Sequence, residues 1–312
     1  MHQQPRFQSG FTRRRAIATG VGGVLAAAST SVIRPARADG HAGGHFDPDN
    51  AASVLRTLHK MRGDEGGRIA MGWLLGRRFG VVNGEITPLM GMVTGTFARH
   101  KILDDGSIAL TSFELAFYTD FYTGELIDTL VMPYTGKTVN VPRLMLGPGT
   151  NVHKPVFHEV LEFGAPPVDE SERSSSETAM RPTGSSRVEK WLGPVTIKDG
   201  HVWITEASSA KLIPADPNAL PVTYSESVTY KGAEADVMNP DLQTIASTLS
   251  YTGITSWRPW MEMGDHPGQT TSHAMGSKTY DVNQLPDTYR QLCETYYPDA
   301  FRDPGAVLDS VG

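Results

Sequence analysis

The sequence predicts a mainly β protein, a single antiparallel β-barrel-like domain with short N- and C-terminal helices. From Arg68 to about Asp281, short β-prone stretches follow one another and are separated by turn residues at the spacing of hairpins. The 312 residues are 39% hydrophobic and include 32 glycines, which supplies both a core and many tight turns. No stretch alternates strand and helix around a glycine-rich phosphate loop, which argues against a nucleotide-binding α/β fold.

Residues 1–38 are predicted to be a twin-arginine signal peptide and not part of the fold. Arg13–Arg15 supply the positive start, Ala16–Ile33 is weakly apolar, and Ala36–Ala38 provides a small-x-small cleavage site. Ala16 stands where the motif commonly has phenylalanine. An ordinary secretory signal and an uncleaved anchor are the alternatives.

This signal implies the twin-arginine translocase as a partner, a periplasmic or secreted location in a bacterium, and no membrane insertion after cleavage. The segment holds six arginines and no acidic residue, so cleavage changes the formal net charge from −6 to −12. An acidic surface without basic runs argues against nucleic-acid binding. Cys293, the one cysteine, is expected to be buried and structural.

The folded part is expected to span residues 47–312, after a flexible leader at 39–46. Asp47 is a candidate N-cap, and Pro48 then occupies the first helical position. Apolar residues recur at helical spacing, which predicts a short amphipathic helix over Pro48–Arg62. These residues are Val54, Leu55, Leu58 and Met61.

Turn residues mark the hairpins that follow. Asn83-Gly84 is a strong two-residue turn, Asp104–Gly106 marks another turn, and Lys198–Gly200 joins two strands further on. Three more stretches are expected to be extended: Pro221–Tyr230, Thr248–Met261 and Thr270–Tyr280.

Two further elements complete the predicted domain. A polar, serine-rich stretch at about 171–187 is expected to be a loop. After Pro286, a closing helix is predicted from side chains at helical spacing. These side chains are Tyr289, Leu292, Cys293 and Tyr296.

Three groups of residues carry a resemblance to a known bacterial family. They are Phe113–Asp120 with Tyr122–Glu125 and Pro133–Gly136; Trp257–Asp265 with Pro267-Gly268; and His273 with Gly276, Lys278 and Leu285-Pro286. Together they resemble the family known as domain of unknown function 1838, whose members often carry export signals. The resemblance implies one β-rich domain and no established reaction.

The stretch Trp257–Asp265 is the first candidate binding site. If it is a strand, Arg258, Trp260 and Glu262 share one face and Trp257 lies on the other. Arginine suits a carboxylate, and an indole suits a planar ligand. The alternative is a solvated Arg258–Glu262 pair beside core tryptophans.

His273 is the candidate proton shuttle, because an imidazole titrates near neutral pH. Glu262 or Glu226 is expected to orient it, so that it acts as a base next to a carbonyl group. The alternative is a histidine that satisfies polar groups of a sheet.

Glu114 and Tyr118 are candidate substrate-binding residues on one face of a predicted strand. Phe113, Leu115 and Phe117 occupy the opposite face. This alternation fits either a polar barrel interior or a solvated sheet face.

Histidines raise the question of a metal site. His153, His158, His266 and His273 are the candidates, but no pair has the helical H-x-x-x-H spacing. We therefore predict no metal and no other cofactor, with the assembly of these histidines left open.

These observations predict an exported β-barrel protein that acts on a small organic molecule by cofactor-free acid–base chemistry. Elimination, isomerisation or hydration would make it a lyase or an isomerase. His273 and Glu262 are the catalytic candidates, and the binding candidates are Arg258, Trp260, Trp257, Tyr118 and Glu114. The alternatives are a non-catalytic periplasmic binding protein for an apolar or aromatic ligand and a metal-dependent enzyme.

Overall fold

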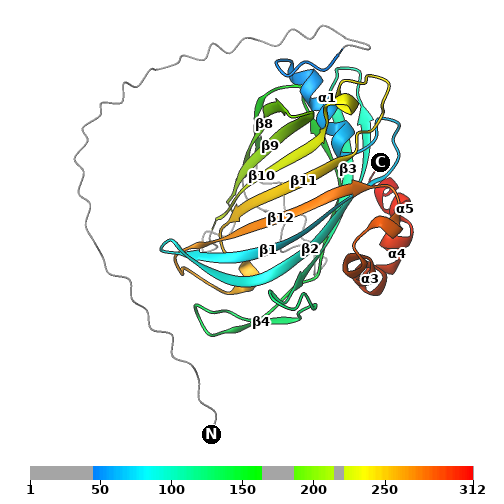
Figure 1. Ribbon diagram of the computed structural model, residues 1–312. Helices are drawn as coiled ribbons and strands as arrows, with labels where there is room; N and C mark the ends of the chain where they lie inside the picture. The colour runs from blue at the N-terminus through cyan, green and yellow to red at the C-terminus, as the bar shows by residue number, and fades with distance from the viewer. Residues whose placement is uncertain (1–44, 164–185, 214–220, 312) are drawn as a thin grey trace, which may run out of the picture. The chain divides into compact units, whose positions relative to one another are not determined.

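The computed structural model describes residues 45–163, 186–213 and 221–311. The predicted signal peptide, nearly all of the leader and most of the predicted polar loop lie outside these ranges. Ten of the described strands form one antiparallel sheet (Figure 1). In spatial order they are β6 (Leu144–His153), β3 (Ile108–Thr119), β2 (Glu85–Ile102), β1 (Ala70–Val82), β12 (Gln269–Thr279), β11 (Ser247–Thr255), β10 (Val222–Ala233), β9 (His201–Leu212), β8 (Ser186–Lys198) and β7 (His158–Phe163).

The fold is mainly β as predicted, but the ten-stranded sheet is not closed into a barrel. Among the described residues, β6 pairs only with β3 and β7 pairs only with β8, so these two strands form the edges. β6 contains Pro148, which has no N–H to donate to a second neighbour. The register between β3 and β6 also shifts between Ser112 and Glu114. Both features suit an edge strand, and the predicted barrel is corrected to an open sheet.

The predicted hairpin turns are confirmed. Asn83 and Gly84 join β1 to β2 with φ angles of 52° and 82°. Asp199 and Gly200 join β8 to β9 with φ angles of 51° and 71°. Two-residue hairpin turns that follow the twist of a sheet need positive φ at both central positions, which asparagine, aspartate and glycine tolerate best. The turn at Asp104–Gly106 likewise joins β2 to β3.

The N-terminal helix α1 (Ala51–Arg62) packs on one face of the sheet, here named the α1 face. Its N-cap is Asn50, whose side chain accepts hydrogen bonds from the N–H groups of Ala52 and Ser53. The prediction of Asp47 as cap was wrong, because that side chain accepts from Asp49 in the preceding turn. The helix buries apolar side chains against strands β8 to β11. The buried cluster consists of Val54, Leu58, Met61, Val202, Ile204, Tyr230, Val237, Ile245 and Leu249.

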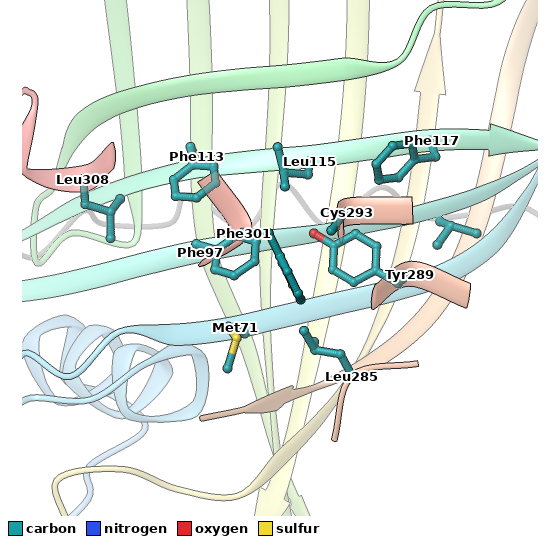
Figure 2. Close-up of a cluster of buried hydrophobic side chains, with 11 residues drawn as sticks. Met71, Phe97, Phe113, Leu115, Phe117, Leu285, Tyr289, Cys293, Phe301 and Leu308 are labelled. Carbon is teal, nitrogen blue, oxygen red and sulfur yellow. The ribbon is translucent and has the colours of Figure 1, made fainter. Parts of the chain in front are cut away.

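The C-terminal helices cover the opposite face of β2 and β3, and the largest buried cluster lies beneath them (Figure 2). α3 (Asp287–Tyr296) is the predicted closing helix, and α4 (Pro298–Arg302) and α5 (Pro304–Asp309) extend it. Phe97 and Phe113 stack there with ring centroids 4.8 Å apart. Cys293 is fully buried in this cluster, as predicted, and burial raises the pKa of its thiol to about 12.

A second cover lies on the α1 face, toward the other end of the strands. The β4 (Thr129–Val131) and β5 (Thr138–Asn140) hairpin and the 3-10 turn η2 (Pro259–Met261) form it. Figure 1 shows β4 and α1 near opposite ends of the sheet. Buried Met90, Met132 and Met261 belong to the apolar cluster under this cover.

The remaining short elements are α2 (Glu234–Val237) and the 3-10 turn η3 (Val282–Gln284). No helix in the described ranges combines the length and the apolar character needed to cross a membrane.

Candidate functional site

A row of directly paired residues crosses five strands on the α1 face. It runs from β1 through β12, β11 and β10 to β9, and consists of Arg78, Ser272, Gly253, Glu226 and Ser208. Polar side chains from β3 and from the segment after β11 join this row. We name the chemistry-bearing group the polar band, and define it as Arg78, Glu114, Tyr118, Glu226 and Arg258.

The polar band lies between the two apolar clusters of the α1 face. Leu74 on β1 packs against the α1 cluster, and Arg78, four residues along the same strand, belongs to the band. Tyr118 packs its ring into the cluster under β4 and β5 and presents its hydroxyl to Arg78. Apolar clusters on both sides lower the local dielectric, which strengthens every charge interaction in the band.

Glu114 and Glu226 are the two carboxyl groups of the band, and both are half-buried. Thr94 Oγ1 donates to Glu114 Oε1 over 2.6 Å, and Ser208 Oγ donates to Glu226 Oε1 over 3.0 Å. Burial raises the pKa of each carboxyl, because loss of water disfavours the charged form. The negative charge of Glu114 further raises the pKa of Glu226.

The two arginines of the band differ from the other buried or half-buried arginines of the described chain. Arg78 is only 4% exposed and donates from Nε to Ser272 Oγ over 2.9 Å and from Nη1 to the Tyr118 hydroxyl over 3.2 Å. Neither Arg78 nor Arg258 forms an ion pair with a described residue. Burial lowers the pKa of Arg258, and the charge of Arg78 lowers it further.

Aromatic rings form a wall beside these charges. The rings of Tyr118 and Trp260 lie 5.5 Å apart, centroid to centroid. The phenol of Tyr251 lies over Gly253, where an added Cβ would collide with it. Burial raises the pKa of the Tyr251 hydroxyl, which therefore stays protonated and available as a donor.

A pocket of about 230 Å³ opens beside Glu114. Its polar lining combines a carboxyl, two hydroxyls and a carboxamide, and Phe113, Leu146 and two glycines of β6 complete it. The polar lining residues are Thr96, Ser112, Glu114 and Asn151. A pocket that combines a few convergent polar groups with apolar walls fits a small organic molecule.

Three histidines gather at the α1 end of the same face. The Nδ1 atoms of His59 and His100 lie 3.0 Å apart, and the rings of His59 and His153 are 5.1 Å apart. The Nε2 atoms of His59 and His100 have no hydrogen-bond partner among the described residues. Burial lowers the pKa of His100 and of His153 to about 3, so both rings are neutral at ordinary pH.

The structure places the predicted catalytic pair away from the polar band. His273 is exposed on the face of β12 opposite to Ser272, with its Nδ1 3.4 Å from the hydroxyl of Thr252. Glu262 is exposed at the C-terminal end of η2, where its φ is 50°. Glu226, the other expected partner of His273, belongs to the polar band and lies on the opposite face of the sheet.

The predicted strand geometry of Trp257–Asp265 was wrong. β11 ends at Thr255, and Pro259 then begins the 3-10 turn η2, so no alternation of faces exists here. A proline has no N–H and is well suited to the start of a helical turn. Trp260 still lies beside Tyr118 of the polar band, and Arg258 lies within range of the Arg78 charge. The Trp257 indole instead donates to the carbonyl of His266 over 3.0 Å.

The histidines named as metal candidates are dispersed. His158 stacks on Trp191 at 5.2 Å, His266 lies 5.5 Å from the Tyr134 ring, and His153 joins His59 and His100. Within residues 45–163, 186–213 and 221–311, no group of three or more His, Cys, Asp or Glu side chains has an arrangement that could hold a metal ion.

Sequence reasoning missed Arg78 and assigned Glu226 only a supporting role. Arg77-Arg78 lies in an alternating strand, so one of the two arginines had to face inward. Glu226 is the acidic residue in a strand of serines, threonines and tyrosines. A charged residue at an inward-facing position of a strand was the signal that could have identified both residues.

The fold and the polar band define an antiparallel β-sheet protein with a group of buried and half-buried polar side chains on one face. Residues 210–310 match the family described as "Protein of unknown function (DUF1838)". This match confirms the resemblance for the segments around Trp257 and His273, and it leaves the segment that begins at Phe113 outside. No curated protein shows significant similarity to the chain.

Proposed function

We propose that this protein acts on a small organic molecule by acid–base chemistry without a cofactor, with Glu114 and Glu226 as the proton-transferring groups. Elimination, isomerisation or hydration are the reactions that such a pair serves. The observation that carries the proposal is a pair of half-buried carboxyl groups on the α1 face whose pKa values are raised by burial, one of which, Glu114, lines a pocket. Titratable groups with perturbed pKa values beside a pocket are typical of active sites.

The surroundings of the two carboxyl groups assign them different roles. After burial, the remaining influences on Glu114 are the Thr94 hydroxyl and the charges of Arg258 and Arg78, all of which favour its carboxylate. For Glu226, the Ser208 hydroxyl and the charge of Arg62 also favour the carboxylate, but the negative charges of Glu206 and Glu114 oppose them and favour the protonated form, an influence that Glu114 lacks. Glu114 is therefore the base and Glu226 is the acid.

An elimination illustrates how protons and electrons balance. Glu114 removes a proton from carbon, and the electron pair of that C–H bond forms the new double bond. The adjacent hydroxyl leaves as water with the proton that Glu226 donates. Exchange of one proton between each carboxyl group and solvent restores the starting state, and hydration is the reverse sequence.

The test is a screen of the folded protein against a bacterial metabolite extract, followed by mass spectrometry. Loss or gain of water, or a new isomer with deuterium incorporated from D₂O, identifies the reaction. Glu114→Gln and Glu226→Gln are expected to reduce turnover of the identified substrate by roughly 10²–10⁴-fold, since each removes one proton transfer.

Two variants with exposed side chains serve as controls, Glu262→Gln and His273→Ala. Both are expected to retain turnover. Loss of turnover in His273→Ala with retention in both Glu→Gln variants of the band would contradict the proposal and return the base to His273. Binding of a metabolite with no turnover would identify a binding protein.

We further propose that the protein is exported by the twin-arginine route and functions in the periplasm or outside the cell. The support is the twin-arginine pattern of residues 1–38. Replacement of Arg13, Arg14 and Arg15 by lysine is expected to retain the precursor in the cytoplasm. Unchanged export of this triple variant, measured by cell fractionation, would contradict the route.

A further inference from the structure

The arginines of the described chain fall into two groups. Eight of them form ion pairs with a carboxylate of a described residue, including Arg62 with Glu206. Three do not, namely Arg77, Arg78 and Arg258. Arg77 is exposed, so water solvates its charge, but Arg78 is 4% exposed and Arg258 is half-buried.

A buried guanidinium without a counterion is costly, because the charge has lost its water without gaining a partner charge. The two described acceptors of Arg78, Ser272 Oγ and the Tyr118 hydroxyl, are both neutral. They use two of the five N–H donors of the guanidinium. Donors remain for a ligand, and the charge of Arg78 remains uncompensated by any described ion pair.

Arg258 adds a second positive charge near Arg78. It lies two residues before Trp260, whose ring is 5.5 Å from that of Tyr118, and the Tyr118 hydroxyl accepts the hydrogen bond from Arg78. The charge of Arg78 also lowers the pKa of Arg258, in addition to burial. Glu114 and Glu226 accept hydrogen bonds from Thr94 and Ser208, and neither forms an ion pair with these arginines. The described protein therefore leaves two clustered guanidinium groups without a directly bonded anion.

We propose that Arg78 and Arg258 bind the carboxylate of a small organic acid, and that this acid is the substrate class of the polar band. That this acid is a substrate rests on the proposed function, but the anion site itself stands on the burial of Arg78, its neutral acceptors, and the lack of a described ion pair at either arginine. The planar fork of a guanidinium matches the two oxygens of a carboxylate. The Trp260 and Tyr118 rings provide a surface for the planar part of the acid.

A carboxylate fits this site better than a phosphate. Glu114 lies within range of the charges of Arg78 and Arg258, and Glu226 within range of the charge of Arg258. Any residual negative charge on them repels a dianion more than a monoanion. A singly charged organic acid therefore matches the net charge of the band.

Sodium benzoate is a suitable probe, because it joins a planar carboxylate to an aromatic ring. Benzamide has nearly the same shape without the charge, and inorganic phosphate tests the competing anion. The measurements are isothermal titration calorimetry at constant ionic strength, tryptophan fluorescence and the thermal midpoint. Benzoate is expected to bind the parent protein, and benzamide and phosphate at least roughly tenfold more weakly.

Arg77→Gln is the matched control, because Arg77 adjoins Arg78 in the same strand, is exposed and also forms no ion pair with a described carboxylate. Arg78→Gln and Arg258→Gln are each expected to weaken benzoate binding by roughly tenfold or more, while Arg77→Gln binds like the parent. Should Arg78→Gln not fold, Arg258→Gln and the charge-retaining Arg78→Lys decide the question.

The proposal is overturned if benzoate does not bind, if it binds no better than benzamide or phosphate, or if Arg77→Gln weakens binding as much as Arg78→Gln. Glu114→Gln separates this proposal from the proposed function, since it removes the base and leaves both arginines. Retained benzoate binding with lost turnover supports both proposals. If Glu114→Gln loses turnover but neither the parent nor this variant binds benzoate, the anion site is rejected and the proposed function is retained.

Discussion

Arg78 donates a hydrogen bond from Nη1 to the hydroxyl of Tyr118 over 3.2 Å, and this bond connects β1 to β3 across β2. The guanidinium carbon also lies 5.4 Å from the centroid of the Tyr118 ring. The contact shows that the alternation of β3 directs Glu114 and Tyr118 into the α1 face and not toward solvent. It also orients the guanidinium within the polar band.

Gly253→Ala is expected to impair the site more than the fold. The new Cβ would collide with the Tyr251 phenol and force this ring away from the band. Because a phenol at the end of a side chain moves more easily than backbone, the stability cost is about 1–2 kcal/mol. Benzoate affinity and the thermal midpoint measure the two effects.

Gly72→Ala is the control for this substitution. Gly72 also lies in a strand, and a Cβ there meets no atom within 4 Å. It is expected to bind benzoate like the parent. Equal binding by Gly253→Ala and the parent would show that Tyr251 is not part of the site.

The hairpins were predictable because their signal is local. Asn83-Gly84 and Asp199-Gly200 adopt positive φ, which few other residue pairs tolerate. The closing helix was predictable for the same reason, since Tyr289 and Cys293 recur at helical spacing. Closure of the sheet depends on pairing between β6 and β7, and no local pattern reports whether two distant edges meet.

The site was only partly predictable. Arg258, Trp260, Glu114 and Tyr118 were identified from the sequence and lie in or beside the polar band. Their common location depends on the register of the five strands from β3 to β11 and on the turn that begins at Pro259, which a strand pattern does not describe. Arg78 was missed because period-two alternation alone does not tell which of two adjacent arginines is buried.

The buried histidines predict instability in acid. Burial lowers the pKa of His100 to about 3, whereas the unfolded chain binds a proton near pH 6.5. The unfolded state therefore binds more protons between these values, and the free energy of unfolding falls as the pH drops below about 6.5. Between about pH 7 and pH 5, His100→Gln is expected to lose less of its free energy of unfolding than the parent does, by at most about 2 kcal/mol.

Urea unfolding at both pH values measures this change. His158→Gln is the control, since the His158 side chain is 50% exposed. If the free energy of unfolding of His100→Gln falls between the two pH values as much as that of the parent, the acid sensitivity does not come from the buried His100 ring.

The buried Lys278 predicts that the free energy of unfolding depends on pH in the alkaline range. Burial lowers its pKa to about 7, and Nζ donates to the carbonyls of Lys60 and Gly63 over 2.6 and 3.0 Å. The unfolded chain keeps this proton up to about pH 10.5, so it binds more protons than the folded chain above about pH 7. The free energy of unfolding should therefore rise between about pH 7 and pH 9.

Lys278→Met is expected to flatten that rise by about 1–2 kcal/mol, although the carbonyls at the end of α1 lose a donor and the overall stability falls. Lys198→Met is the control, because the Lys198 side chain is 72% exposed. The measurement is urea unfolding at fixed ionic strength. An unchanged slope in Lys278→Met would assign the alkaline rise to other groups.

Trp260→Phe tests the aromatic wall. Trp260 is half-buried, and its ring lies 5.5 Å from that of Tyr118. If it contacts the ligand, phenylalanine retains an apolar surface but removes the fluorescence response to benzoate and weakens its binding. A large drop in the thermal midpoint with unchanged binding would identify Trp260 as a core residue.

Arg258→Lys tests whether the geometry of the guanidinium matters beyond its charge. Lysine keeps one positive charge but loses the planar fork, so a two-oxygen contact with benzoate should weaken by about 1–3 kcal/mol. A solvated arginine would show only about 0–1 kcal/mol, as exposed ion pairs do. Because Arg258 forms no ion pair with a described carboxylate, the substitution should change stability little. Titration calorimetry and thermal unfolding of the same variant therefore distinguish a ligand-binding arginine from a structural one, and equal benzoate affinity in variant and parent would remove Arg258 from the site.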